Sequence, residues 1–241
     1  RWAFCGASAA VMHGLDCSYR QLHPIHVAVG RNSRPRNQRY VRFHVLDDAE
    51  TVAVDGARVT SILRTLVDCA AMMPRRYAMA PIDSALRQGK TTVEQMLEYV
   101  DAIPMLRDRE RIRAVLAQGD GRVENGGESE CRAVLDELGF PVHRVQVEFP
   151  CLSHPGRVHR VDFLWERDDG TLIAGEFDGV QKYVDPLMTA GRTIRQVVDD
   201  ERDRQQCLSR RGVDMVRMFY RDLDNAQVLA YRLEQARVPR R

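Results

Sequence analysis

RVDFLWERDDGTLIAGEFDGVQK, residues 160–182, decides the fold of the second half of this chain. Two apolar runs flank the polar segment 166–170, which ends in Asp-Gly, and this pattern predicts a β-hairpin. The first run contains Asp162, and the second ends in Glu176 and Asp178. A carboxylate inside a strand is costly unless a partner compensates it. Three carboxylates on two adjacent strands therefore indicate a site for a divalent cation, Mg²⁺ or Mn²⁺.

The periodic segments around this hairpin predict an α/β protein, α+β overall, with a small sheet covered by helices. After residue 120 we expect a helix over 128–138, strands over 144–149, 158–165 and 171–177, a helix over about 196–210, a strand over 213–219 and a helix over 222–237. Before it we expect a short helix over 7–15, a strand over 25–30 with a return strand over 40–46, a hairpin over 51–60, a helix from 61 to 74 and three modest helices across 79–119.

Four glycines within residues 119–127 predict a linker. We therefore place the domain boundary there, with one domain over 1–120 and a second over 121–241. Because the chain begins with Arg1 rather than Met, we expect an upstream segment to be absent from it.

Composition points to a globular, cytoplasmic protein that has no membrane partner. Of the 241 residues, 44% are hydrophobic and 29% are charged, and the formal net charge is only +2. The six cysteines include no Cys-x-x-Cys pair, which favours free buried thiols over zinc ligands or disulfides. The seven histidines also suggest no ligand set, and we expect His154 and His159 to be exposed.

The second half resembles the PD-(D/E)XK nuclease superfamily, in particular the bacterial group related to very-short-patch-repair endonucleases. Five pieces carry the resemblance over residues 124–236, in the family's order and spacing: Glu128-Ser129…Arg132, Gly139-Phe140-Pro141, Gln146, Arg160-Val161-Asp162-Phe163-Leu164-Trp165 and Glu176-Phe177-Asp178-Gly179. The resemblance implies a restriction-endonuclease-like αβββαβ core and Mg²⁺-dependent endonuclease hydrolysis of DNA phosphodiesters.

The resemblance also implies roles for individual residues. Asp162 and Glu176 would hold the metal, and Glu128 and Asp178 would complete the site or reach it through water. Lys182 would stabilise developing phosphate charge, or would be an ordinary solvated lysine. Supporting roles near the site would fall to Gln146, Glu201, Arg204 and Arg217.

One position departs from the superfamily pattern, which has lysine where this chain has Asp178. Two hypotheses follow: an active endonuclease, and a catalytically inactive nuclease fold that acts as a regulator.

Residues 1–75 resemble the AbiEi-type antitoxins of bacterial abortive-infection systems. The pieces that carry this resemblance are Ser8-Ala9-Ala10…His13-Gly14-Leu15, His26-Val27-Ala28-Val29 and Val59-Thr60-Ser61…Arg64-Thr65-Leu66-Val67-Asp68. In that family these segments follow a winged helix, so the resemblance implies that a winged helix precedes Arg1. It also implies DNA binding or regulation and, as a third hypothesis, a cognate toxin as partner.

A basic segment, residues 31–42, is the candidate nucleic-acid contact in this half. Arg34, Arg36 and Arg39 lie close to Tyr40, so the segment could bind phosphate and stack a base. A solvated basic loop is the alternative.

Overall fold

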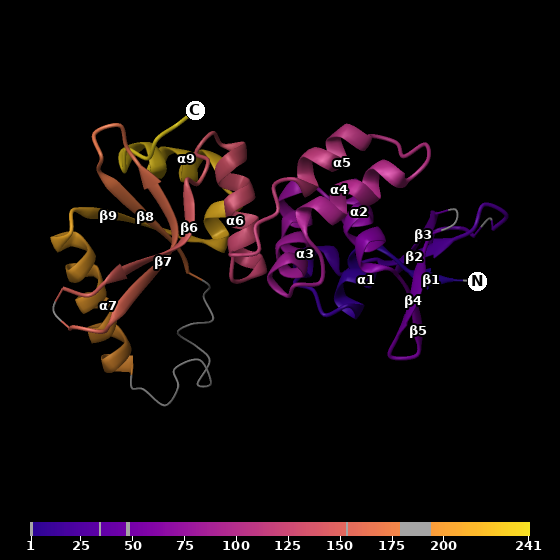
Figure 1. Ribbon diagram of the computed structural model, residues 1–241, viewed down its shortest axis with the longest axis horizontal. Helices are drawn as coiled ribbons and strands as arrows, with labels where there is room; N and C mark the ends of the chain where they lie inside the picture. The colour runs from indigo at the N-terminus through magenta and orange to yellow at the C-terminus, as the bar shows by residue number, and fades with distance from the viewer. Residues whose placement is uncertain (1, 34, 47–48, 153, 179–193) are drawn as a thin grey trace. The chain divides into compact units, whose positions relative to one another are not determined.

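The computed structural model describes residues 2–33, 35–46, 49–152, 154–178 and 194–241, with only the backbone described over 194–201 (Figure 1). The chain divides into two compact units, Arg1–Glu130 and Cys131–Arg241. This division falls inside a helix, later in the chain than the boundary predicted between residues 120 and 121.

The first unit holds a mixed five-stranded sheet and five α-helices among its described residues. Its elements are β1 (Ala3–Phe4), α1 (Gly6–Met12), the 3-10 helix η1 (Tyr19–Gln21), β2 (Ile25–Val29), β3 (Val41–Val45), β4 (Thr51–Val54), β5 (Ala57–Thr60), α2 (Ile62–Met72), α3 (Arg75–Arg87), α4 (Val93–Ala102) and α5 (Arg109–Leu116). The strand order is β3-β2-β1-β5-β4.

Local signals in the first unit produce the elements they predict. At the β4–β5 turn, Asp55 and Gly56 have φ values of 47° and 79°, as a tight hairpin between twisted strands requires. The Ser61 side chain caps α2 by accepting a hydrogen bond from the Arg64 N–H, and Thr92 and Gln95 form a capping box on α4.

The predicted return strand is wrong in direction. β3 runs parallel to β2, in a register that pairs Ile25 with Val41 and Val29 with Val45. The connection between them is long enough to carry the chain back before the second strand begins, which a parallel pair requires. In the strand order, β3 lies at one edge of the sheet.

The glycine run 119–127 is a packed segment of the first unit. A Cβ on Gly119 would lie 2.6 Å from Leu86 Cδ1, and one on Gly121 would lie 3.0 Å from the backbone carbonyl carbon of Leu86. Val123 is 1% exposed. The glycines at 119 and 121 therefore allow a close backbone approach to α3. This close packing explains the high glycine content, which in the sequence alone predicts a linker.

The second unit is a four-stranded sheet covered by helices, in the predicted element order. α6 (Gly126–Glu137) leads into it, followed by β6 (Arg144–Pro150), β7 (Val158–Glu166), β8 (Leu172–Asp178), α7 (Ile194–Arg210), β9 (Val213–Phe219), α8 (Tyr220–Leu223) and α9 (Ala226–Gln235). The strand order is β6-β7-β8-β9, and β9 runs parallel to β8. The α/β fold class is thus confirmed.

The helix predicted over 222–237 is broken in two. α8 ends at Leu223, and the side chain of Asn225 caps α9 by accepting a hydrogen bond from the Val228 N–H. A residue that prefers helix caps therefore starts a new helix here.

Both faces of the second sheet are buried, as its long apolar runs require. On one face Leu164 and Ala174 pack with Leu208 of α7. On the other, Gly175 lies against the ring of Trp165, which donates a hydrogen bond to the Phe140 carbonyl. The site described next lies on the α7 face.

Candidate functional site

Strand alternation brings the predicted carboxylates together on the α7 face of the second sheet. Asp162 alternates with Val161 and Phe163, which are both fully buried. Glu176 and Asp178 are two residues apart on β8, and both are nearly buried at 4% and 6% exposure. Arg217 pairs with Glu176 in the parallel β8–β9 register, so it shares their face.

Each carboxylate has a partner within the unit. Asp162 Oδ2 accepts a hydrogen bond of 2.8 Å from the Phe177 N–H. Glu176 forms an ion pair with Arg204 of α7. Asp178 Oδ2 lies 3.9 Å from Arg217 Nη1. The structure therefore gathers Asp162, Glu176, Asp178, Arg204 and Arg217 into one acid–arginine cluster.

Burial dominates the electrostatics of Glu176. Desolvation raises the pKa of its carboxyl, Arg204 opposes that rise, and the negative charges of Asp162 and Asp178 add to it. Two guanidinium groups do not fully offset three carboxylates in formal charge. A cation would therefore interact favourably with the cluster.

Gln146 of β6 lies opposite Asp162 on the adjacent strand β7. The β6–β7 register pairs Val145 with Phe163 and Val147 with Val161, which places Gln146 opposite Asp162. Its φ of 52° lies in the left-handed region, which is strained for a residue with a side chain. Such strain within a strand is commonly found beside functional sites.

Glu128 has hydrogen-bond partners within the first unit. Its carboxylate accepts hydrogen bonds from the Glu124 N–H at 2.9 Å and from the Asn125 side-chain amide at 2.5 Å. The Asn125 side chain in turn caps α6 by accepting from the N–H groups of Gly127 and Glu128. These bonds hold the Glu128 carboxylate against the backbone and the capping side chain at the start of α6.

Some predicted site residues lie outside the described residues. These are Lys182, Arg34 and the side chain of Glu201. Another acidic side chain near the start of α6, Glu130, is buried in an ion pair with Arg76 at 2.5 Å.

In the first unit, the residues that carry the antitoxin resemblance contact one another. The His26 N–H donates to Ser8 Oγ at 2.8 Å, and His13 Nε2 lies 2.7 Å from the Thr60 carbonyl oxygen. The hydroxyls of Thr60 and Thr65 are 2.7 Å apart and buried. These contacts join α1, β2, β5 and α2, so the motif builds the fold of this unit.

The same motif contains a buried ion pair, Arg64–Asp68, at 2.8 Å. Burial raises the pKa of Asp68 to about 6, against the opposing charge of Arg64. This pair lies within α2 and is 11% and 3% exposed at its side chains, so it is structural rather than a ligand contact.

The described part of the basic segment leads into the edge strand β3. Arg36 and Arg39 are exposed, and the Arg39 guanidinium lies 5.0 Å from the centre of the Tyr40 ring. Tyr40 is itself 59% exposed. A cationic and aromatic surface in the loop before an edge strand is suited to phosphate contacts and base stacking.

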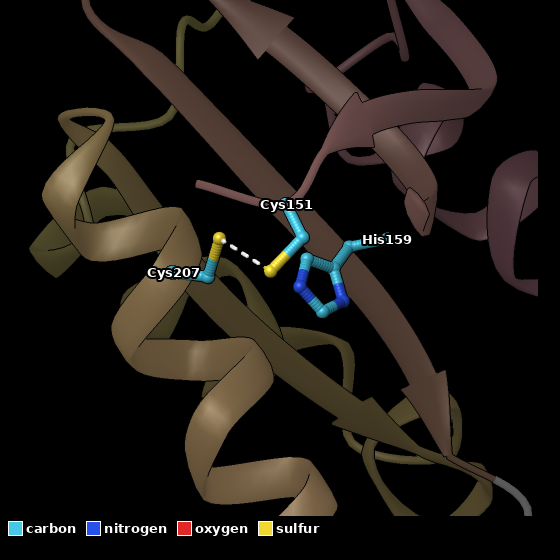
Figure 2. A group of neighbouring side chains, drawn as sticks. All are labelled: Cys151, His159 and Cys207. Atoms are coloured by element: carbon cyan, nitrogen blue, oxygen red, sulfur yellow. Dashed lines mark hydrogen bonds between the residues drawn. The ribbon is translucent and has the colours of Figure 1, made fainter. Parts of the chain in front are cut away.

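One group of side chains was missed by the sequence reasoning. His159, expected to be exposed, is 4% exposed and lies with Cys151 and Cys207. Figure 2 shows these three side chains pointing toward one another. Their spacing of 8 and 48 positions along the chain matches no short metal motif, so only the fold reveals the group.

Fold and clusters together define a two-unit α+β protein: a sheet-and-helix unit built on a buried polar motif, followed by a four-stranded unit with an acid–arginine cluster. Residues 2–118 match the family model of the AbiEi antitoxin C-terminal domain. The match supports the antitoxin resemblance and extends it from residue 75 through α5. The nuclease resemblance of residues 124–236 stays a prediction.

The chain is also similar to two curated proteins of Mycobacterium tuberculosis. They are Uncharacterized protein MT2308 of strain CDC 1551 / Oshkosh and Uncharacterized protein Rv2248 of strain ATCC 25618 / H37Rv. Each is 28% identical over 213 residues, which covers 82% of this chain and 74% of the relative. The similarity therefore reaches into both units. Within the described ranges, no helix has the length and apolar character needed to cross a membrane.

Proposed function

We propose that this protein is the regulatory, antitoxin component of a bacterial toxin–antitoxin system. The observation that carries the proposal is the match of residues 2–118 to the AbiEi antitoxin C-terminal domain, which spans nearly the whole first unit. The partner is a cognate toxin protein, and the exposed arginines of the loop before β3, Arg36 and Arg39, contact DNA.

Co-expression tests the antitoxin role. Each reading frame adjacent to the gene is expressed alone and then together with the full chain in a bacterial host. We expect one frame to arrest growth alone, and the full chain to restore growth. If no adjacent frame is toxic, or if a toxic one is unaffected by the chain, the antitoxin proposal fails.

DNA binding is tested by substitutions in the loop before β3. Replacing Arg36 and Arg39 with Ala should weaken binding similarly across DNA sequences, because phosphate contacts carry no sequence information. The slope of log K against log salt should fall by about one for each lost contact. The matched control is the Arg58→Ala, Arg107→Ala pair, which removes the same charge from exposed positions of the same unit. Equal slopes for the two double variants would show that the loop is only a solvated surface.

A second candidate function, metal-dependent phosphodiester hydrolysis, rests on the acid–arginine cluster. Asp162, Glu176 and Asp178 offer carboxylate oxygens, the donors that Mg²⁺ and Mn²⁺ prefer. Burial and the two neighbouring carboxylates raise the pKa of Glu176, and a bound cation would offset that unfavourable negative charge. When bound, such an ion would activate water and stabilise phosphate charge. The two arginines already pair with Glu176 and Asp178, which favours the regulatory role over catalysis.

Thermal unfolding with and without Mg²⁺ or Mn²⁺ separates these possibilities. A metal that binds only the native protein raises the melting temperature by mass action, and Asp162→Asn should remove that rise. Asp168→Asn, an exposed change in the same hairpin, should keep it. A metal-dependent rise together with DNA cleavage that Glu176→Gln abolishes would establish an endonuclease. A rise without cleavage would indicate a regulator that retains the ligands, and no rise at millimolar metal would refute the metal site.

A further inference from the structure

We propose that Cys151, His159 and Cys207 bind a zinc ion that ties α7 to the β6–β7 hairpin. This site is separate from the proposed antitoxin function and from the acid–arginine cluster. One potential ligand atom from each of these side chains lies within 4.8 Å of the other two.

The three side chains come from different elements and converge (Figure 2). Cys151 directly follows β6, His159 is the second residue of β7, and Cys207 lies in the last turns of α7. The β6–β7 register pairs Phe149 with His159, and the Cys151 N–H donates to the Arg157 carbonyl at 2.7 Å. The hairpin backbone therefore fixes two of the three ligands.

The distances suit a tetrahedral zinc ion. Two sulfurs bound to zinc at about 2.3 Å and at the tetrahedral angle are about 3.8 Å apart. The Sγ atoms of Cys151 and Cys207 are 3.6 Å apart, so zinc could bind with little movement. A disulfide would require the two sulfurs to approach to about 2.05 Å.

The surroundings provide a second, independent indication of a ligand. His159 is 4% exposed, yet its Nε2 atom has no hydrogen-bond partner among the described residues. A buried imidazole nitrogen without a partner is costly, and a metal bond would satisfy it. Neutral imidazole and thiolate are also the donors that zinc prefers.

Neighbouring groups complete the site. The Leu152 N–H donates to Cys207 Sγ at 3.1 Å, a bond of the kind that stabilises a metal-bound thiolate. His154 Nδ1 lies 3.8 Å from Cys151 Sγ, so a fourth potential donor, a second nitrogen, lies beside the group. Cys151, His154, His159 and Cys207 line a cavity of about 120 Å³, which leaves room for the ion.

The full-length protein, purified under reducing conditions without chelator, tests the proposal by its metal content. We expect one zinc per chain, a lower melting temperature after chelation, and recovery when zinc is added back. Cys151→Ser and His159→Asn should each weaken zinc binding on the order of 100-fold or more. Loss of a residue that only hydrogen-bonds to a ligand already lowers metal affinity by about 10–100-fold. Cys131→Ala, which removes a buried thiol elsewhere in the same unit, is the control and should bind zinc normally.

Cobalt substitution gives a readout that does not depend on stability. Co²⁺ in the wild-type site should show thiolate charge-transfer absorption, and Cys151→Ser should reduce that band by about half, because one of two thiolates is lost. Zinc-free protein that fails to bind added zinc would overturn the proposal. So would normal zinc binding by Cys151→Ser and His159→Asn.

Discussion

The stacked imidazoles of His26 and His44 predict that the first unit loses stability in mild acid. Their rings lie 5.0 Å apart at the centroids, and His26 Nδ1 lies 2.9 Å from His44 Nε2. Burial and, after it, the charges of His26 and Arg42 together lower the pKa of His44 from 6.5 to about 4. Burial and Arg42 also lower the pKa of His26.

The sign follows from proton uptake. In the unfolded chain His44 takes up a proton near pH 6.5, and in the folded chain only near pH 4. The unfolded state therefore binds more protons between these pH values. The stability contribution of His44 is thus fully present above pH 6.5 and is lost as the pH falls toward 4. The difference between the two pKa values corresponds to a loss of at most about 3.4 kcal/mol in the free energy of unfolding. Solvent screening of this half-buried ring reduces the expected loss to about 1–2 kcal/mol.

Urea unfolding at pH 7.0 and 4.5 tests this prediction, with wild type compared with His44→Asn. The variant should lose about 1–2 kcal/mol less than wild type between the two pH values, because it lacks the titrating ring. The comparison is needed because Asp68, with its pKa raised to about 6, acts in the opposite direction over the same range. His23→Asn, at an exposed position, serves as the control. Equal losses in wild type and His44→Asn, or an NMR titration of His44 near pH 6.5, would refute the reasoning.

Three further predictions concern packing and capping. Arg204→Leu should destabilise the protein by about 1–3 kcal/mol at pH 8 and by progressively less as the pH falls, because burial raises the pKa of Glu176 and protonation relieves its buried charge. A loss in denaturant unfolding that does not change with pH would contradict this. Gly175→Ala should cost about 1–3 kcal/mol, because its Cβ would lie 2.7 Å from Trp165 Cζ3, and a neutral result in thermal melts would show that the ring can move aside. Ser61→Ala should cost about 1 kcal/mol by removing the α2 cap, a loss that denaturant unfolding can detect and that Ser61→Asn should largely restore.

The sequence predicted the features that depend on neighbouring residues. The Asp-Gly turns, the start of a helix at Ser61 and the alternation that places Asp162 and Glu176 on one face all follow from local rules. Features that depend on distant pairing were not predictable. β1 has only two residues and shows no periodicity, yet it joins β2 to β5 at the centre of the first sheet.

The same distinction explains the site residues. Arg217 could be expected to find a carboxylate, because a charge inside an apolar strand requires a partner, and it lies 3.9 Å from Asp178. Cys151, His159 and Cys207 gave no such signal, because a cysteine or histidine is unremarkable when it stands alone in a strand or helix. Their grouping depends on how α7 packs against β6 and β7.

That packing links the two clusters of the second unit. Arg204, which pairs with Glu176 and also donates to the Arg160 carbonyl, lies one turn before Cys207 on α7. An ion held by Cys207 and His159 would fix α7 against β7 and so fix Arg204 over Glu176. Loss of zinc should therefore loosen the pair and allow the pKa of Glu176 to rise further, because Arg204 is the group that most opposes its burial. Measuring that pKa by NMR in zinc-loaded and chelated protein would decide the link, and an unchanged value would show that the two clusters act independently.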